Sequence, residues 1–238
     1  MKIVISCLCL GLSASSLLQA QIDGTAAPGK ANGRMAWFVH TSLPDGLENP
    51  VSVLVGESVI QVMLSKFAPS DPVKIPADGI LRIVRKVANP KDPLKPGYLT
   101  IGLATVPATV SRALVILMPA DKNPDGLLFR TNVQDLAAMQ GGDTMFLNMT
   151  KLNIGIELGS AKFVVSPGQR KIHDALGTAQ SVSLPIRLSY LDPSRKEWEM
   201  ITASTVALYA TRREMCVFNW DAKFNRVDYE SITLPAIE

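Results

Sequence analysis

The feature that most constrains the fold is the alternation of apolar and polar residues at every second position. It is clearest in residues 182–190, where Val, Leu, Ile, Leu and Tyr are separated by Ser, Pro, Arg and Ser. A period of two places the apolar side chains on one face of a β-strand. Residues 99–103 and 197–200 repeat the pattern, and the apolar run 114–117 predicts a strand buried on both faces. Because Pro185 cannot donate to a ladder, its strand is predicted to be an edge or to carry a bulge.

Turn-forming residues separate these apolar segments. Asp-Gly or Pro-Gly steps occur at residues 45–46, 78–79, 125–126 and 167–168, and they favour tight reversals of the chain. Helical signals are few, and the only candidate is one or two turns over residues 132–139, with Asn132 as the cap. Many short strands between frequent turns predict an all-β sandwich.

The chain also repeats itself. Segments with matching spacing are 38–40 with 146–148, 51–56 with 154–159, and 60–62 with 163–165. Arg112 and Arg212 lie one hundred positions apart, and each leads into an apolar run. We therefore predict two tandem antiparallel β-sandwich (immunoglobulin-like) halves, residues 35–141 and 142–238. The alternative is that two unrelated β domains share alternation and turn glycines.

The first twenty residues have the layout of a secretory signal peptide. Lys2 is their only charge, residues 3–18 are mostly apolar, and Ala20 supplies a small residue for cleavage. A buried N-terminal element is the alternative. Residues 21–34 lack periodicity and are predicted to form a flexible leader. We expect export to the periplasm, the cell surface or the extracellular space, with no transmembrane segment after the signal peptide is removed.

Composition excludes several classes of protein. The formal net charge is only +3, whereas nucleic-acid-binding proteins usually carry a strongly basic patch. Cys216 is the only cysteine after residue 20, so an intramolecular disulfide is excluded and the fold depends on its core.

The sequence shows no convergent set of catalytic residues. It contains two histidines, His40 and His173, and no Gly-x-Ser-x-Gly elbow. Cys216 lies in an apolar run, where burial makes a thiol inert. Glu197 and Glu199 share a strand face and are the best carboxylate pair for an enzyme acting on a polymer. We expect a solvated strand face there, and therefore no enzyme.

One loop resembles the first half of a calcium-binding loop. Asp121, Asn123 and Asp125 supply oxygens at alternate positions, and Gly126 follows them. The bidentate glutamate is missing, because Asn132 occupies its position. The loop is therefore a weak metal candidate beside the simpler hypothesis of a Pro-Asp-Gly turn, and calcium is the only cofactor that the sequence raises.

After the catalytic and metal-binding candidates, the remaining candidates are residues that could bind a ligand at the surface. Of the three tryptophans, Trp37 and Trp198 are predicted to lie in the core, and Trp220, between Asn219 and Asp221, is the best candidate for an exposed ring. Lys91 and Lys95 in a proline-rich loop could meet an anionic glycan or lipid surface. The partner is expected to be an envelope protein or a glycan.

The second half contains residues 146–150 (Phe-Leu-Asn-Met-Thr), an alternating strand that ends at Leu158-Gly159, and a Pro-Gly turn at residues 167–168. In these motifs it resembles a group of exported bacterial proteins of unknown function. The resemblance covers mainly residues 143–190. It implies an all-β fold and carries no known activity, so no functional residue transfers.

These observations together predict an exported, non-enzymatic binding or structural module of the cell envelope. Two alternatives stay open at this point: an enzyme acting on an envelope or extracellular polymer, and a calcium-stabilised structural β domain.

Overall fold

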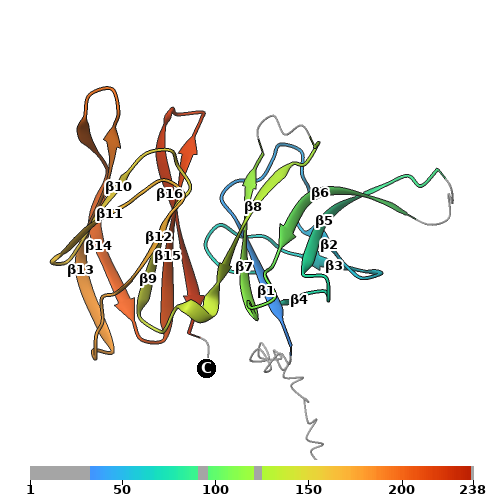
Figure 1. Ribbon diagram of the computed structural model, residues 1–238, viewed down its shortest axis with the longest axis horizontal. Coiled ribbons are helices and arrows are strands. Elements are labelled where there is room, and N and C mark those ends of the chain that lie inside the picture. Colours follow the sequence, from blue (N-terminus) through green and yellow to red (C-terminus); the bar gives the residue numbers. More distant parts are fainter. Residues whose placement is uncertain (1–32, 91–95, 121–124, 237–238) are drawn as a thin grey trace, which may run out of the picture. The chain divides into compact units, whose positions relative to one another are not determined.

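The computed structural model describes residues 33–90, 96–120 and 125–236 (Figure 1). These residues belong to one compact unit, which runs from Asn32 to Glu238. The predicted signal peptide, nearly all of the predicted leader, and the candidate residues Lys91, Lys95, Asp121 and Asn123 lie outside the described residues.

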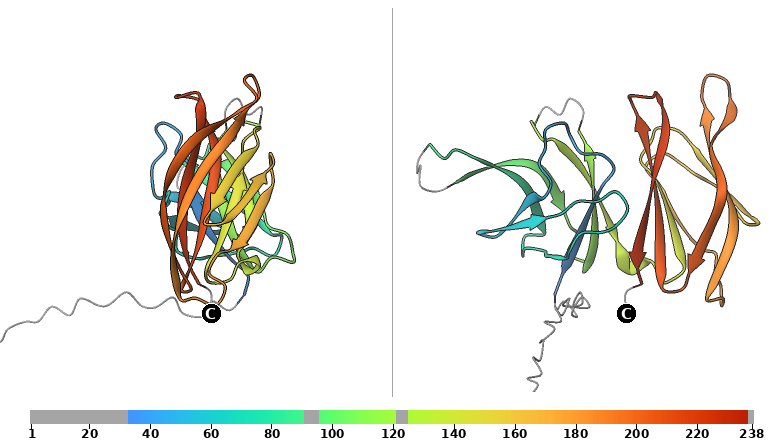
Figure 2. Two further views of the ribbon diagram at one scale, coloured as in Figure 1. Left: turned by 90° about the vertical axis from the view of Figure 1, so that its left-hand side faces the viewer. Right: turned by 180° about the vertical axis from the view of Figure 1, so that it is seen from behind.

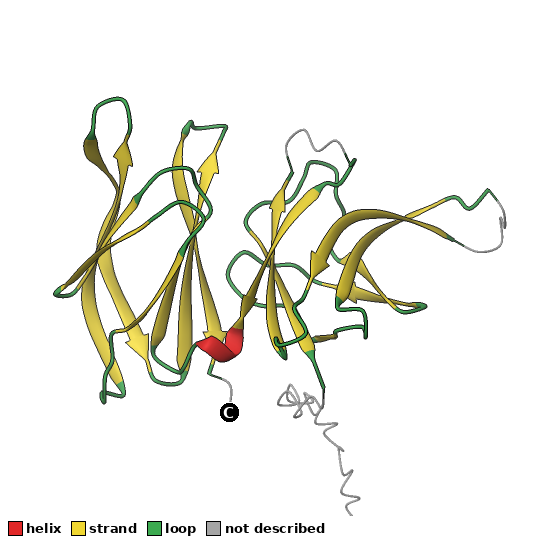
Figure 3. Ribbon diagram, viewed as in Figure 1, coloured by secondary structure: helices red, strands yellow, loops and turns green. Residues whose placement is uncertain are grey.

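The described chain is built of strands (Figure 3), as the alternation predicts. The first eight are β1 (Met35–His40), β2 (Val51–Val55), β3 (Ser58–Val62), β4 (Val73–Lys74), β5 (Ile80–Val87), β6 (Gly97–Thr105), β7 (Arg112–Pro119) and β8 (Phe129–Asp135). The next eight are β9 (Asp143–Asn148), β10 (Ile154–Leu158), β11 (Ala161–Val165), β12 (Arg170–Asp174), β13 (Ser181–Asp192), β14 (Glu197–Tyr209), β15 (Arg212–Asp221) and β16 (Arg226–Pro235).

The strands form four sheets, two in each half of the chain. Sheet A has the order β4-β1-β7-β8 and sheet B the order β3-β2-β5-β6. Sheet C (β12-β9-β15-β16) and sheet D (β11-β10-β13-β14) repeat these orders with every strand number raised by eight. The pairs β1–β7 and β9–β15 are parallel, and all other pairs are antiparallel. The prediction of two tandem sandwich-like halves is confirmed (Figures 1 and 2).

The repeat extends to local irregularities of the strands. The hairpins β2–β3 and β10–β11 turn at Gly56 and Gly159, whose φ angles are 61° and 57°. Glycine adopts this left-handed conformation without strain. A β-bulge interrupts the β5–β6 ladder between Ile83 and Val84, and the β13–β14 ladder has one at the equivalent place, between Leu188 and Ser189. Bulges are specific features rather than defects, so the shared position supports an internal duplication.

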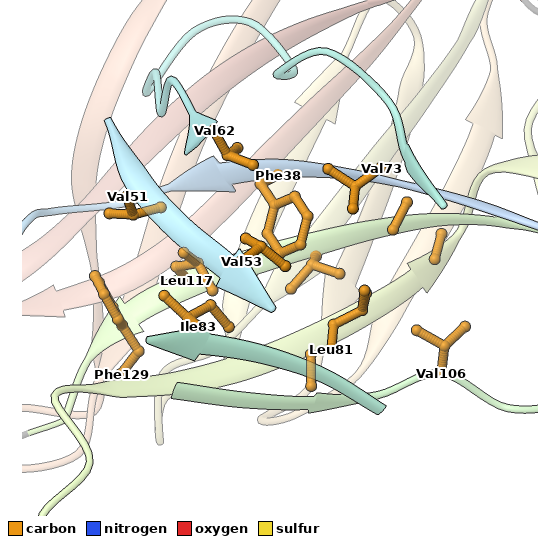
Figure 4. Packing of buried hydrophobic residues seen from close by; sticks show 14 of the residues in the cluster. Phe38, Val51, Val53, Val62, Val73, Leu81, Ile83, Val106, Leu117 and Phe129 are labelled. Carbon is orange, nitrogen blue, oxygen red and sulfur yellow. The ribbon is translucent and has the colours of Figure 1, made fainter. Parts of the chain in front are cut away.

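Three apolar clusters form the core. The first joins sheets A and B and includes Phe38, Val53 and Leu81 (Figure 4). The second joins sheets C and D, and the third lies between sheets A and C. Alternate residues of β7 face different clusters, because Val115 packs with sheet B and Leu114 with sheet C. The strand at residues 114–117 is therefore buried on both faces, as predicted.

A buried arginine fastens the chain where the two halves join. The Arg213 side chain is 1 % exposed. Its Nε and Nη2 donate to the Pro235 carbonyl at 3.0 and 2.6 Å, and its Nη1 donates to the Leu136 carbonyl at 2.8 Å. Burial lowers the pKa of Arg213 to about 10. The guanidinium thereby donates to the Pro235 carbonyl and to the Leu136 carbonyl, which also accepts from the Met139 N–H at 3.3 Å.

Two sequence-based expectations about local structure need correction. Strand β13, which contains Pro185, is central in sheet D rather than an edge, and the extra residue of the nearby bulge, Ile201, lies in β14 and not in β13. Pro185 is tolerated because the β10–β13 ladder ends at the pair Leu158–Ile186, so the ladder does not need an N–H from Pro185. The turn expected over residues 132–139 is a 3₁₀ helix, η1 (Leu136–Ala138), capped by Asp135 rather than Asn132.

No helix in the described residues is long and apolar enough to span a membrane.

Candidate functional site

A shallow hollow of about 430 Å³ lies on the outer face of sheet D, the face turned away from sheet C. All four strands of the sheet contribute to it. The lining residues are Gly155, Ile156, Glu157, Lys162, Phe163, Val164, Arg187, Ser189, Trp198 and Met200. We call this hollow the sheet D groove.

Alternation along β10 explains why the groove has these walls. Ile154, Ile156 and Leu158 are buried against sheet C, so Gly155 and Glu157 face outwards. Gly155 pairs with Val164 on one side and with Ser189 on the other. Glu157 pairs in the same way with Lys162 and Arg187. The floor of the groove is therefore two neighbouring rows of cross-strand partners.

The Trp198 indole lies against the sheet at Gly155. A Cβ atom at Gly155 would lie 2.7 Å from Ser189 Oγ and 2.9 Å from Cζ3 of Trp198. Both distances are shorter than real Cβ contacts, so any larger residue would displace the ring. Glycine in a strand interior often marks such a close approach.

Three apolar side chains of the groove are well exposed. Trp198 is 49 %, Val164 53 % and Met200 66 % exposed. The core placement that the sequence predicts for Trp198 is therefore wrong. Trp198 does lie in an alternating strand, but its side chain points to the face of sheet D that no other sheet covers.

Charged groups lie at one end of this apolar surface. Lys162 Nζ is 3.1 Å from Glu157 Oε2, in an ion pair open to solvent. Arg187, the other neighbour of Glu157, is exposed and has no carboxylate partner among the described residues. The groove thus combines an aromatic ring with a carboxylate, two cations and the Ser189 hydroxyl.

The carboxylates that the sequence singles out do not line the groove. Glu199 accepts a hydrogen bond from the Tyr190 hydroxyl and forms an ion pair with Arg195. Glu197 is exposed at the start of β14, and no ion pair of Glu197 occurs among the described residues. The two residues belong to the same strand, as expected, and Asp192, the acid opposite Glu197 in the ladder, is bound by Arg195.

The other candidates are spread over the molecule. Trp220 is 46 % exposed, and an exposed ring is what the sequence predicts. It lies near the end of β15, by the β15–β16 turn, and does not line the groove. Trp37 is partly buried against the cluster between sheets A and C. Asp125 is exposed, while the other two calcium candidates lie outside the described residues. The described residues contain no group of three His, Cys, Asp or Glu side chains that could hold a metal.

The histidines and the cysteine likewise do not converge. His40 belongs to β1, His173 to β12 and Cys216 to β15. Cys216 is buried, and burial raises its thiol pKa to about 12. A thiol with such a pKa is not a nucleophile at neutral pH.

The Asn-x-Thr segment at residues 148–150 is structural. Asn148 is fully buried, and its Nδ2 donates to the carbonyls of Leu152 and Val165 at 2.7 and 2.8 Å. Its Oδ1 accepts from the backbone N–H and the hydroxyl of Thr150 at 2.9 and 2.8 Å. The asparagine therefore fixes the loop after β9 to the end of β11, which accounts physically for the motif.

No protein-family model matches the chain, and no curated protein sequence matches it either. The sheet D groove is therefore interpreted from its own geometry. Sequence reasoning missed it because its key residue is Gly155, whose meaning depends on neighbours from two other strands. The available signal was a glycine in the middle of an alternating strand.

Proposed function

We propose that the protein is an exported, non-enzymatic binding module of the cell envelope that takes its ligand in the sheet D groove. The observation that carries this proposal is the half-exposed Trp198 ring lying over Gly155. Exposed aromatic side chains that keep a fixed position are typical of binding surfaces, because little side-chain entropy is lost when a ligand packs against them.

The chemistry of the groove favours a glycan as the ligand. Sugar rings offer an apolar face that can stack on an indole, and hydroxyl groups that need donors and acceptors. Trp198 and Met200 supply the apolar contact, and Glu157, Arg187 and Ser189 supply the polar groups. The volume, about 430 Å³, is that of a site for one or two rings rather than for a globular partner.

Binding without hydrolysis fits the distribution of acids. A glycosidase needs two carboxylates on opposite sides of the scissile bond. Among the residues that line the groove, Glu157 is the one carboxylate, and Lys162 neutralises it at 3.1 Å. This arrangement supports the binding module over the enzyme hypothesis.

Co-sedimentation with purified peptidoglycan sacculi tests the proposal, because sacculi are an insoluble envelope glycan. The purified protein is expected to pellet with the sacculi, and Trp198→Ala to weaken the binding at least tenfold. Trp220→Ala is a matched control, since the two rings are almost equally exposed, at 46 % and 49 %.

The contrast between these two variants decides the outcome. Thermal unfolding of both variants shows whether they remain folded. Failure of the wild-type protein to bind sacculi, or equal losses in Trp198→Ala and Trp220→Ala, would overturn the proposal.

A further inference from the structure

Strand β14 forms an open edge of sheet D. It is the terminal strand of the order β11-β10-β13-β14, and its thirteen residues make it the longest strand in the described chain. Between Met200 and Tyr209 it contains no charged residue, no proline and no glycine. Natural proteins usually protect edges by short strands, charges, prolines or a covering segment.

The geometry of Pro185 identifies which backbone groups of β14 face the open side. Pro185 lies directly opposite Thr205, has no N–H, and its carbonyl accepts from the Gly159 N–H at 2.9 Å, on the side away from β14. The pair is therefore a non-hydrogen-bonded pair, in which the backbone groups point outwards from both strands. The N–H and C=O of Thr205 thus face the open edge, and those of Ala203 and Ala207 follow by alternation.

The equivalent edge in the first half is covered. Strand β6 holds the same position in sheet B. Its Ile101 carbonyl accepts from the Leu128 N–H at 2.8 Å, and its Leu103 carbonyl accepts from the Thr131 hydroxyl at 2.7 Å. The segment that enters β8 therefore protects β6. In the described part of the second half, β14 has no such partner.

The remaining edges are protected in other ways. Strands β3, β11 and β12 have five residues each and β4 has two. Strand β8 carries Arg130 and Asp135. Strand β16 carries charges, and its Thr233 N–H donates to the Phe67 carbonyl at 3.1 Å. Strand β14 is thus the exception among the edges of the four described sheets.

We propose that two copies of this chain associate through β14, edge to edge and antiparallel, so that two D sheets join into one eight-stranded sheet. The charges at the two ends of β14 favour a second copy as the occupant. Glu197 begins the strand and is exposed, without an ion pair in the described part of the chain, and Arg212 follows shortly after the strand ends. Antiparallel pairing brings the Glu197 carboxylate of each strand near the Arg212 guanidinium of the other.

Symmetry restricts the pairing further. A twofold axis perpendicular to the sheet makes the interface self-complementary and closes it at two copies. Opposite residues in an antiparallel pair share a face, so each side chain on the axis meets its own counterpart. The axis is expected at Ser204 or Thr205, near the middle of β14. An axis at Ser204 places Glu199 opposite Tyr209 of the second copy, and an axis at Thr205 places it opposite Thr211. This association does not depend on what the sheet D groove binds.

Sedimentation equilibrium of the purified protein over a wide concentration range tests the pairing. The wild-type chain is expected to form dimers, and Thr205→Lys to raise the dimer dissociation constant at least tenfold, because two lysines then meet near the axis. Thr105→Lys is the matched control at the equivalent position of β6 and is expected to leave the constant unchanged. A wild-type protein that stays monomeric at every concentration overturns the proposal.

Disulfide trapping is an independent second test. Cys216 is buried, so the single variants Ser204→Cys and Thr205→Cys each add one accessible thiol. Under mild oxidation, the variant on the axis is expected to form a covalent dimer rapidly, because opposed Cα atoms lie about 4.5–5.5 Å apart. If neither variant forms the disulfide faster than Thr105→Cys does, the antiparallel β14 pairing is wrong.

Discussion

The outer faces of sheets B and D differ, although their strands pair in the same order and carry a bulge at the same place. The register aligns Ser52 with Gly155, Val84 with Ser189, and Thr100 with Met200. In sheet B, Ser52 Oγ accepts from Gln61 Nε2 at 3.0 Å and Val84 is only 3 % exposed. The two halves therefore share the ladder and the buried faces, and the candidate site lies where their solvent-facing residues differ.

The halves also differ at the end of their first strand. Asn148 ends β9 with four hydrogen bonds, and His40 ends β1 at the equivalent position. His40 Nδ1 is buried without a hydrogen-bond partner in the described chain. Burial, with the nearby charge of Lys66, lowers the pKa of His40. In the first half Asn49 fixes the equivalent loop instead, by two 2.9 Å bonds to the backbone of Leu64.

The largest effect is expected from Asn148→Ala. The change leaves buried backbone groups without partners, which costs about 2–4 kcal/mol of unfolding free energy. Urea unfolding at neutral pH measures the loss. His40→Ala is the matched variant and is expected to cost less, because the His40 ring has one backbone bond to lose, with Ser42, whereas Asn148 has four hydrogen bonds. Equal losses of unfolding free energy would contradict this expectation, because the two positions would then contribute equally to stability.

Gly155→Ser gives the second half the residue that the first half has at the equivalent position, Ser52. The added Cβ meets Ser189 and Trp198 at less than 3 Å, which is expected to displace the indole and to destabilise the fold by about 1–2 kcal/mol. The fluorescence emission of the protein should shift to longer wavelength as the ring moves into water. Ser52→Gly is the reverse change in sheet B and should leave the emission unchanged. An unshifted Gly155→Ser spectrum would contradict the role given to this glycine.

Glu214→Gln tests a charge that β7 lacks. The corresponding part of β7 is apolar and buried, whereas burial raises the pKa of Glu214 in β15. The folded state therefore favours the protonated acid, and ionised Glu214 destabilises the protein above the folded-state pKa. The variant should raise the melting temperature at pH 7.5, and the gain should disappear below the unfolded-state pKa. Glutamine can keep the 2.8 Å bond from the Thr233 hydroxyl, so an unchanged melting temperature at pH 7.5 would contradict this expectation.

The smallest effect is expected from Lys162→Ala. The Lys162 and Glu157 side chains are 70 % and 41 % exposed, and an ion pair so open to solvent contributes about 0.5 kcal/mol or less. Chemical denaturation with and without added salt checks this value. A larger, salt-sensitive loss would mean that the charged end of the sheet D groove also stabilises the fold.

The sequence predicted the features that depend on local periodicity. The strands around residues 51–55, 114–117 and 182–190 follow from alternation or apolar runs, and the repeat follows from equal spacing in the two halves. Alternation identifies two faces of a strand, but it does not tell which face another sheet will cover. The sequence therefore predicts a core position for Trp198, whereas the ring lies on the outer face of sheet D, 49 % exposed. The groove depends on three strands meeting at Gly155, and no single segment encodes that meeting.

The apolar cluster between sheets A and C has a consequence for dissecting the molecule. Each of these sheets is buried on both sides, since β7 and β15 send alternate side chains into two different clusters. A chain cut near residue 141 would give two fragments, each with one apolar sheet face exposed to solvent. Such fragments are expected to recombine with one another or to precipitate.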